Sequence, residues 1–264
     1  MREFRVRYLH THFNHLRILV ALILPALLSS LMAQAQATAD NTFFTRKNTL
    51  GFFGAYSGDS SHILLGDAEN RKLLEIGFSY GRRLALNHIV NWQYNVELIP
   101  VVLESDPMTL FTDHQTQPTE MTYSYESAPE VSCSPVTVQY SFVDQLTGIT
   151  YSGSTTMTCH GRRWVTGVGM SPAGFQLNFL PRRKVQPFLI GHGGYMYSSQ
   201  PIPIDSAGSF NFTFDIGAGF ELYRAKARSI RAEYRYHHIS NDNTARYNPG
   251  IDNGVIQFTY CFGR

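Results

Sequence analysis

Several stretches of the chain alternate between apolar and polar residues with a period of two, which is the pattern of β-strands. In the clearest stretch, 210–222, the even positions carry Phe, Ile, Ala or Leu and the odd positions carry Asn, Thr, Asp, Gly or Glu. Residues 74–80 and 90–98 repeat the pattern. Because successive side chains of a strand point to opposite faces, each of these strands has one apolar and one polar face.

The alternation, together with the turn residues between the stretches, predicts eight strands. They lie at 48–57, 71–82, 88–103, 163–180, 185–198, 208–223, 229–240 and 253–262. The connections near 83–88, 181–185 and 224–228 are short and basic, whereas those at 58–70, 104–162, 199–207 and 241–252 are longer. An even number of strands with short turns at one end and long loops at the other is typical of an outer-membrane β-barrel, with both termini in the periplasm.

A soluble β-sandwich would show the same alternation, but its large aromatic side chains would have to interdigitate in the interior. Here the polar faces carry Gly, Asn, Glu and Asp, which suits a narrow lumen, and the rings lie near strand ends, as in aromatic girdles. Aromatic residues make up 13% of the chain and charged residues only 16%, against about 25% charged in soluble domains. We therefore expect an all-β fold, an eight-stranded antiparallel outer-membrane barrel.

One long apolar run, residues 18–32, follows several arginines near the N-terminus and precedes alternating alanines at 33–39. A basic start, a short apolar core and A-x-A sites describe a secretory signal peptide. The alternative is a membrane anchor, but a run of about 15 residues is shorter than a spanning helix needs, and Pro25 interrupts it. We expect residues 1–37 to be a cleaved signal peptide and residues 40–264 to form a barrel in the bacterial outer membrane.

The connection at 104–162 is too long for an ordinary loop, and we expect it to be an extended extracellular loop. Two alternating runs between residues 136 and 157 predict a small β-hairpin within it. Cys133 and Cys159 flank this hairpin, and an oxidising compartment would let them form a disulfide at its base. Cys261 falls at an inward position of the last strand, where we expect a buried structural thiol.

Three polar residues interrupt the apolar outer face at the last two strands. The charged residues of strand 229–240 occupy odd positions and are expected in the lumen: Arg231, Glu233 and Arg235. The even positions His238 and Ser240 therefore stand on the lipid face at the outer end of the strand. Asp252 shares its parity with the apolar positions of strand 253–262. A histidine, a serine and a carboxylate thus converge beside lipid, which is a costly place for polar groups.

These residue types are those of a serine hydrolase. His238 can take the proton from Ser240 Oγ, and Asp252 can orient the imidazole and stabilise the imidazolium. The alternative is that all three are polar residues at headgroup level, since a serine two positions from a histidine is common by chance. No metal cluster is visible, because His237 and His238 point to opposite faces of a regular strand. No cofactor is expected.

The segment from His238 to Asp252 resembles the active-site region of the lipid A 3-O-deacylases of the PagL family, also called acyloxyacyl hydrolase-like proteins. The motif H-x-S-N matches at His238, Ser240 and Asn241, and Asp252 occupies the position of the family's acidic residue. Asn248, Gly250 and Ile251 match the stretch just before that acid. The chain departs from the family in having Asp in place of Glu and in the length of the 104–162 loop.

This resemblance implies an eight-stranded outer-membrane barrel in which Ser240 hydrolyses the ester that holds a 3-hydroxyacyl chain at the 3-position of lipid A. It assigns the oxyanion hole to Asn248 and the backbone near Asn243, with Asn241 in support. An apolar strip would hold the acyl chain: Tyr234, Tyr236, Phe258 and Tyr260. Arg246 could meet lipid A phosphates or could be a solvated loop charge.

Two other functions are compatible with the sequence. One is a non-enzymatic barrel, an adhesin or structural protein that binds through its long loop. The other is an outer-membrane phospholipase that acts on a different ester. The expected partners are lipid A or lipopolysaccharide as substrate and the outer membrane, with a homodimer left open. Nucleic acid is not expected, because the formal net charge is only +2 and phosphate affinity needs concentrated Lys and Arg.

Overall fold

The computed structural model describes residues 43–129 and 133–264, so the predicted signal peptide at 1–37 lies outside the described residues. The described residues form ten β-strands. These are β1 (Asn48–Ser57), β2 (Lys72–Leu86), β3 (Val90–Gln117), β4 (Met121–Ser127), β5 (Val136–Val143), β6 (Thr150–Phe179), β7 (Val185–Ser198), β8 (Phe210–Ala225), β9 (Arg228–Ser240) and β10 (Ile251–Gly263). Within the same residues, no helix has the length and apolar character needed to cross a membrane.

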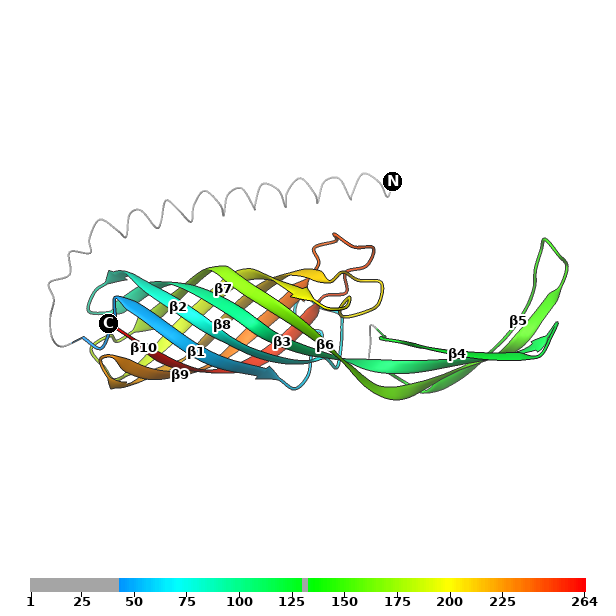
Figure 1. The fold of residues 1–264 in the computed structure, drawn as a ribbon, viewed down its shortest axis with the longest axis horizontal. Helices are drawn as coiled ribbons and strands as arrows, with labels where there is room; N and C mark the ends of the chain where they lie inside the picture. Colours follow the sequence, from blue (N-terminus) through cyan, green and yellow to red (C-terminus); the bar gives the residue numbers. More distant parts are fainter. Residues whose placement is uncertain (1–42, 130–132) are drawn as a thin grey trace.

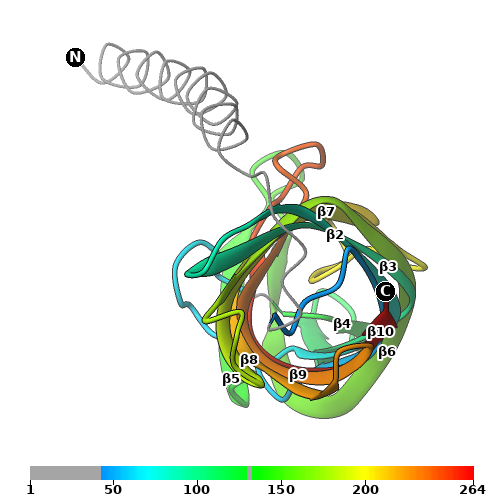
Figure 2. The same cartoon turned by 90° about the vertical axis from the view of Figure 1, so that its left-hand side faces the viewer.

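Eight of the described strands close into an antiparallel barrel (Figures 1 and 2). Hydrogen bonds connect them in the order β3-β2-β1-β10-β9-β8-β7-β6, and pairing of β6 with β3 completes the ring. The predicted eight-stranded antiparallel barrel is therefore confirmed. The strands predicted at 48–57 and 185–198 have the bounds of β1 and β7, whereas β3 and β6 are much longer than predicted.

The two ends of the barrel differ in their connections. The C-terminus and three short turns, at 87–89, 180–184 and 226–227, lie at one end (Figure 1). The longer connections at 58–71, 199–209 and 241–250 lie at the other end, which we call the outer end. The predicted alternation of short and long connections is confirmed, and the outer end carries the candidate site.

The side chains of the barrel strands alternate between an apolar outer wall and a polar lumen. On the outer wall, β8 and β10 expose rows of large apolar residues: Phe210, Phe212, Phe214, Ile216, Phe220, Ile256, Phe258, Tyr260 and Phe262. In the lumen, the charged residues of β9 are buried as predicted: Arg231, Glu233 and Arg235. Cys261, the free cysteine among the described residues, is buried too. An apolar band around a polar interior is the arrangement of membrane barrels.

Beyond the outer end, β3 and β6 continue together and are joined by β4 and β5 in the order β4-β3-β6-β5. Figure 1 shows this four-stranded sheet, here called the protruding sheet, extending away from the barrel. The segment 104–162 is thus mostly strand, and the expectation of a loop with one hairpin was incomplete. The predicted hairpin is present as the β5–β6 pair. A disulfide joins Cys133 to Cys159.

The protruding sheet is tied to the barrel by a cluster of charged side chains at the outer end. Arg71, from the β1–β2 connection, donates to Asp106 Oδ1 (3.2 Å) and to the carbonyl oxygen of Pro203 (3.0 Å). Arg163 donates to the other oxygen of Asp106 at 2.8 Å and pairs with Asp205 at 2.5 Å. Burial lowers the pKa of the Arg71 guanidinium, and the nearby Asp106 carboxylate opposes this change. This cluster fixes the β1–β2 and β7–β8 connections beside the base of the sheet.

Candidate active site

The pairing of β9 with β10 brings two of the predicted site residues into contact. Asp252 stands directly opposite His238 in the strand register. The distance between His238 Nδ1 and Asp252 Oδ1 is 2.6 Å. Since Nδ1 faces the carboxylate, Nε2 is the ring nitrogen that can accept a proton from a nucleophile.

The carboxylate of Asp252 is buried and accepts hydrogen bonds on both oxygens. Oδ1 faces His238 and also accepts from the hydroxyl of Tyr236 at 2.8 Å. Oδ2 accepts from the backbone amides of Leu64 and Leu65, at 2.7 and 2.8 Å. These contacts, from β9 and from the β1–β2 connection, fix the orientation of the carboxylate toward the imidazole. The donors other than His238 could not be read from the sequence, because they depend on the path of the β1–β2 connection and on the reach of a tyrosine.

Ser240 ends β9, two residues after His238 and on the same face of the strand. Its hydroxyl donates to Asn248 Oδ1 at 3.0 Å and accepts from the backbone amide of Asp242 at 3.1 Å. A hydroxyl has one proton, so in this conformation that proton points to Asn248. These two contacts of the Ser240 hydroxyl do not involve His238, so the structure pairs the histidine with Asp252 but not with the serine.

The asparagines predicted to support the site shape the turn after Ser240. Asn248 Oδ1 also accepts from the backbone amide of Asn241 at 3.0 Å. The side chain of Asn241 is buried; it donates to the carbonyl oxygen of Tyr247 (2.7 Å) and accepts from the backbone amide of Asn243 (2.9 Å). Asp242 and Asn243 have φ angles of 49° and 61°, which asparagine and aspartate tolerate better than most residues. The result is a tight turn that places a backbone N–H beside the serine.

The four rings predicted to hold an acyl chain all belong to the outer wall, at different distances from the site. Tyr234 and Phe258 are each 59% exposed, and Tyr260 is exposed as well. Tyr236 is partly covered because its hydroxyl binds Asp252. Tyr260 lies eight residues beyond Asp252, about 26 Å along the strand. Tyr234 and Tyr236 are therefore much nearer to the site than Tyr260.

Two further rings lie beside the site and were missed as site residues. The β8–β9 register places Phe212 next to Ser240 and Phe214 next to His238, and both rings are exposed on the outer wall. Directly paired side chains of antiparallel strands share a face and lie close together. Both residues belong to the clearest alternating stretch of the sequence. Their position relative to β9 depends on strand register, which the alternation does not give.

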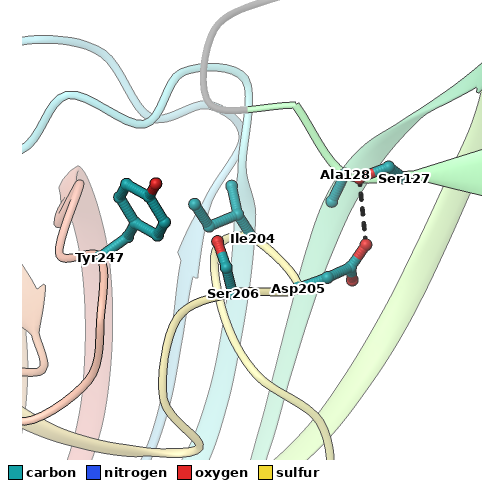
Figure 3. Close-up of a pocket in the computed structure, with 6 residues that line it drawn as sticks. All are labelled: Ser127, Ala128, Ile204, Asp205, Ser206 and Tyr247. Carbon is teal, nitrogen blue, oxygen red and sulfur yellow. Dashed lines mark hydrogen bonds between the residues drawn. The ribbon is translucent and has the colours of Figure 1, made fainter. Parts of the chain in front are cut away.

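A pocket of about 410 Å³ lies close to the turn that follows Ser240, since its lining includes Tyr247, whose carbonyl oxygen accepts from Asn241. Its lining residues come from the end of β4, the β7–β8 connection and the β9–β10 connection (Figure 3): Ser127, Ala128, Ile204, Asp205, Ser206 and Tyr247. Ser127 Oγ donates to Asp205 Oδ2 at 3.1 Å on the side of the pocket away from Tyr247. The guanidinium of Arg246 lies 5.4 Å from the ring centre of Tyr247. The protruding sheet thus supplies one wall of a pocket beside the site.

One group in the lumen has the composition of a metal site. Glu97, His192 and Asp215 bring one ligand atom each within 4.8 Å of the others. They come from three strands, so sequence spacing could not reveal them. Arg235 donates to both oxygens of Glu97, at 2.9 and 2.8 Å, and lies 3.5 Å from Asp215. The arginine already balances these carboxylates, so we assign the group to the lumen network.

The stretch that contains His238, Ser240 and Asp252 also matches a known family. Residues 136–260 match the model of the lipid A 3-O-deacylase (PagL) family. This match confirms the PagL resemblance of the chain; it begins at β5 and includes all but the last residues of β10. Comparison with curated proteins gives no match.

Solved structures with some likeness to the chain are β-barrels of low sequence identity. Neisserial surface protein A has a TM-score of 0.42 and 11% identity, covering 83% of this chain and 97% of that protein. The outer membrane protein OprG from Pseudomonas aeruginosa has a TM-score of 0.40 and 12% identity, covering 85% of this chain and 100% of OprG. The barrel described above follows from the pairing of this chain's own strands.

Proposed function

We propose that the protein is an outer-membrane esterase that removes the 3-O-linked acyl chain from lipid A, with Ser240 as nucleophile, His238 as base and Asp252 as the acid that orients it. The observation that carries the proposal is the 2.6 Å contact between His238 Nδ1 and Asp252 Oδ1. It lies two residues from a serine, on the outer wall, and within the PagL match. A buried carboxylate that orients an imidazole beside a serine is the arrangement that activates serine nucleophiles.

The surface of the barrel supports the proposed location. Its outer wall is apolar and rich in rings, and its lumen is polar, as in transmembrane barrels. In this proposal the chain is exported through a cleaved signal peptide, and the outer end faces the leaflet that contains lipid A. A homodimer stays a hypothesis, which the mass of the purified protein in detergent would test.

The proposed reaction begins when the Ser240 hydroxyl turns from Asn248 toward His238 Nε2. Its Oγ attacks the ester carbonyl carbon while Nε2 takes the proton, and Asp252 stabilises the imidazolium. The Asp242 amide and the Asn248 side-chain amide would stabilise the oxyanion. The imidazolium then gives its proton to the departing 3-hydroxyl oxygen of lipid A, which leaves an acyl-serine. Water activated by the imidazole releases the free fatty acid and restores the serine.

Substrate contacts follow from the placement of the rings and charges around the serine. The acyl chain would lie along the outer wall against Phe212, Phe214 and the nearer rings of β9, Tyr234 and Tyr236. Phe258 and Tyr260 would contact only the distal part of a chain or neighbouring lipids. Arg246 would meet a lipid A phosphate from the β9–β10 connection.

The test is to express wild type and Ser240→Ala in a Gram-negative host whose lipid A carries a 3-O-acyl chain, and to compare lipids by mass spectrometry. Wild type should yield lipid A that lacks one hydroxyacyl chain, and Ser240→Ala should not. Ser199→Ala, an exposed serine at the same end of the barrel, should behave as wild type. Altered phospholipids with intact lipid A would indicate a phospholipase. Identical lipid profiles for wild type and Ser240→Ala would indicate a non-enzymatic barrel.

A further inference from the structure

The connection between β1 and β2 lies directly over the acid of the proposed triad. Three of its backbone amides donate to carbonyl oxygens of residues 249–252: Ser61 to Asp252 (3.2 Å), Asp67 to Pro249 (2.6 Å) and Ala68 to Gly250 (3.1 Å). Ser60 and Ala68 also form isolated β-bridges with Asn253 and Ile251. The connection is therefore held against the start of β10 along much of its length.

At the centre of this connection, the segment Ile63–Gly66 contacts the carboxylate itself. The amides of Leu64 and Leu65 both donate to Asp252 Oδ2. Gly66 is pressed against the backbone of β10, since a Cβ there would lie 2.6 Å from Asp252 N and 2.8 Å from Ile251 C. This close approach permits only glycine, and it keeps the two amides within reach of the acid.

The side chains of the same segment do not take part in these contacts. Ile63, Leu64 and Leu65 are 43%, 68% and 63% exposed. Three consecutive exposed apolar side chains are unusual in a loop that water surrounds, but they are suited to contact with an apolar ligand. Their backbone is bonded to Asp252, which pairs with His238, so the apolar surface lies beside the proposed site.

We propose that the segment Ile63–Gly66 couples acyl-chain binding to the alignment of Asp252. The side chains of Leu64 and Leu65 contact the acyl chain of the ester, and their amides hold the carboxylate against His238. An acyl chain long enough to reach the leucines stabilises the loop conformation that orients the acid. Leu64 and Leu65 are positioning residues in this scheme, which rests on the ester hydrolysis proposed above.

Two variants separate the side-chain role from the amide role. The double variant Leu64→Ser/Leu65→Ser keeps both amides and removes the apolar contact; its kcat/KM for a long-chain ester should fall about tenfold, with part of the loss in kcat because the bound chain no longer stabilises the aligned acid. Gly66→Ala should push the segment away from Asp252 and lower kcat by about tenfold or more, with a smaller change in KM. Leu65→Pro, which removes one amide donor, replaces Gly66→Ala if that variant does not fold.

Matched controls exist for both variants. Gly58→Ala lies in the same connection, where a Cβ would meet only Tyr56 at ordinary distances of 3.6 Å or more. Leu146→Ser removes a leucine that is 97% exposed in the β5–β6 turn, far from the site. Both controls should match wild type in kcat and KM.

The purified protein in detergent would be assayed with p-nitrophenyl laurate and p-nitrophenyl butyrate. Labelling of Ser240 by a fluorophosphonate would report triad alignment without an acyl chain. The proposal expects the double leucine variant to lose efficiency on laurate but not on butyrate and to label at the wild-type rate, and Gly66→Ala to label slowly. Equal losses on both esters, or normal labelling of Gly66→Ala, would overturn it. If wild type labels no faster than Ser240→Ala, the proposed function itself fails, and the coupling fails with it.

Discussion

The amide of Asn248 faces the proposed nucleophile with its oxygen rather than its nitrogen. Ser240 Oγ and the backbone amide of Asn241 both donate to Oδ1, and two donors at one atom fix which end of the amide is the oxygen. The oxygen therefore holds the serine in its resting orientation. The NH₂ group is the part of this side chain that can donate to a developing oxyanion.

Asn248→Asp separates these two roles, because aspartate keeps an oxygen at the position of Oδ1 and loses the NH₂ donor. We expect kcat for lipid A deacylation to fall about 100-fold with little change in KM, as when one oxyanion donor is removed. Asn243→Asp is the matched control, since Asn243 enters the turn through its backbone amide. A wild-type kcat for Asn248→Asp would contradict this prediction. It would show that the oxyanion is stabilised by the Asp242 amide and not by the Asn248 side chain.

At the level of elements, the strands of the barrel could be predicted because each has one apolar and one polar face. The protruding sheet has no lumen beneath it, and residues 104–117 of β3 show no sustained alternation. The prediction therefore ended this strand near residue 103 and missed its pairing with β6. Prediction of the site was limited in the same way, because strand pairing and loop path cannot be read from the sequence. The motif gave His238, Ser240 and Asp252, but Phe214 and the amide of Leu64 depend on register and loop path.

The disulfide should stabilise the protruding sheet and not the barrel, because Cys133 and Cys159 both lie outside the barrel wall. Closing a loop with a sequence separation of 26 is worth about 3 kcal/mol in the chain-entropy estimate. In the double variant Cys133→Ser/Cys159→Ser, we expect faster cleavage of segment 104–161 and an unchanged barrel unfolding midpoint. Chymotrypsin is the suitable protease, because this segment contains no Lys or Arg.

The matched control for this prediction is Cys261→Ser, which keeps the disulfide and changes a buried residue of the barrel. It should leave cleavage of the sheet as in wild type and should affect the barrel alone. If the barrel unfolding midpoint of the disulfide variant falls together with the stability of the protruding sheet, the two parts unfold as one unit.

At the scale of the whole molecule, the charged residues of the barrel strands are concentrated in the lumen rather than on the outer wall. Arg235 on β9 donates to both oxygens of Glu97 on β3. These strands stand four places apart in a ring of eight, so the pair connects opposite walls of the barrel. Near the other end of the lumen, Arg46 pairs with Glu221 at 2.5 Å. The interior is thus a cross-linked polar core, which takes the place of the apolar core of a soluble protein.

Because the lumen acts as a polar core, removing one member of the Arg235–Glu97 pair should strongly destabilise the folded barrel. Arg235→Met leaves a buried carboxylate without its partner and should lower the free energy of unfolding by about 3 kcal/mol or more. Adding Glu97→Gln should recover part of that loss, because it removes the orphaned charge. Arg228→Met, on the same strand but exposed, should change stability by less than about 0.5 kcal/mol.

Urea unfolding in phosphocholine vesicles would measure these differences through the fluorescence of Trp92 on β3, with Trp164 replaced by phenylalanine in every variant to leave a single reporter. If Arg235→Met and Arg228→Met unfold at the same urea concentration, the link between opposite walls contributes nothing. If the double variant is no more stable than Arg235→Met, the cost comes from lost packing of the arginine rather than from the unpaired charge. Recovery in the double variant is therefore the result that identifies the ion pair as the link between the two walls.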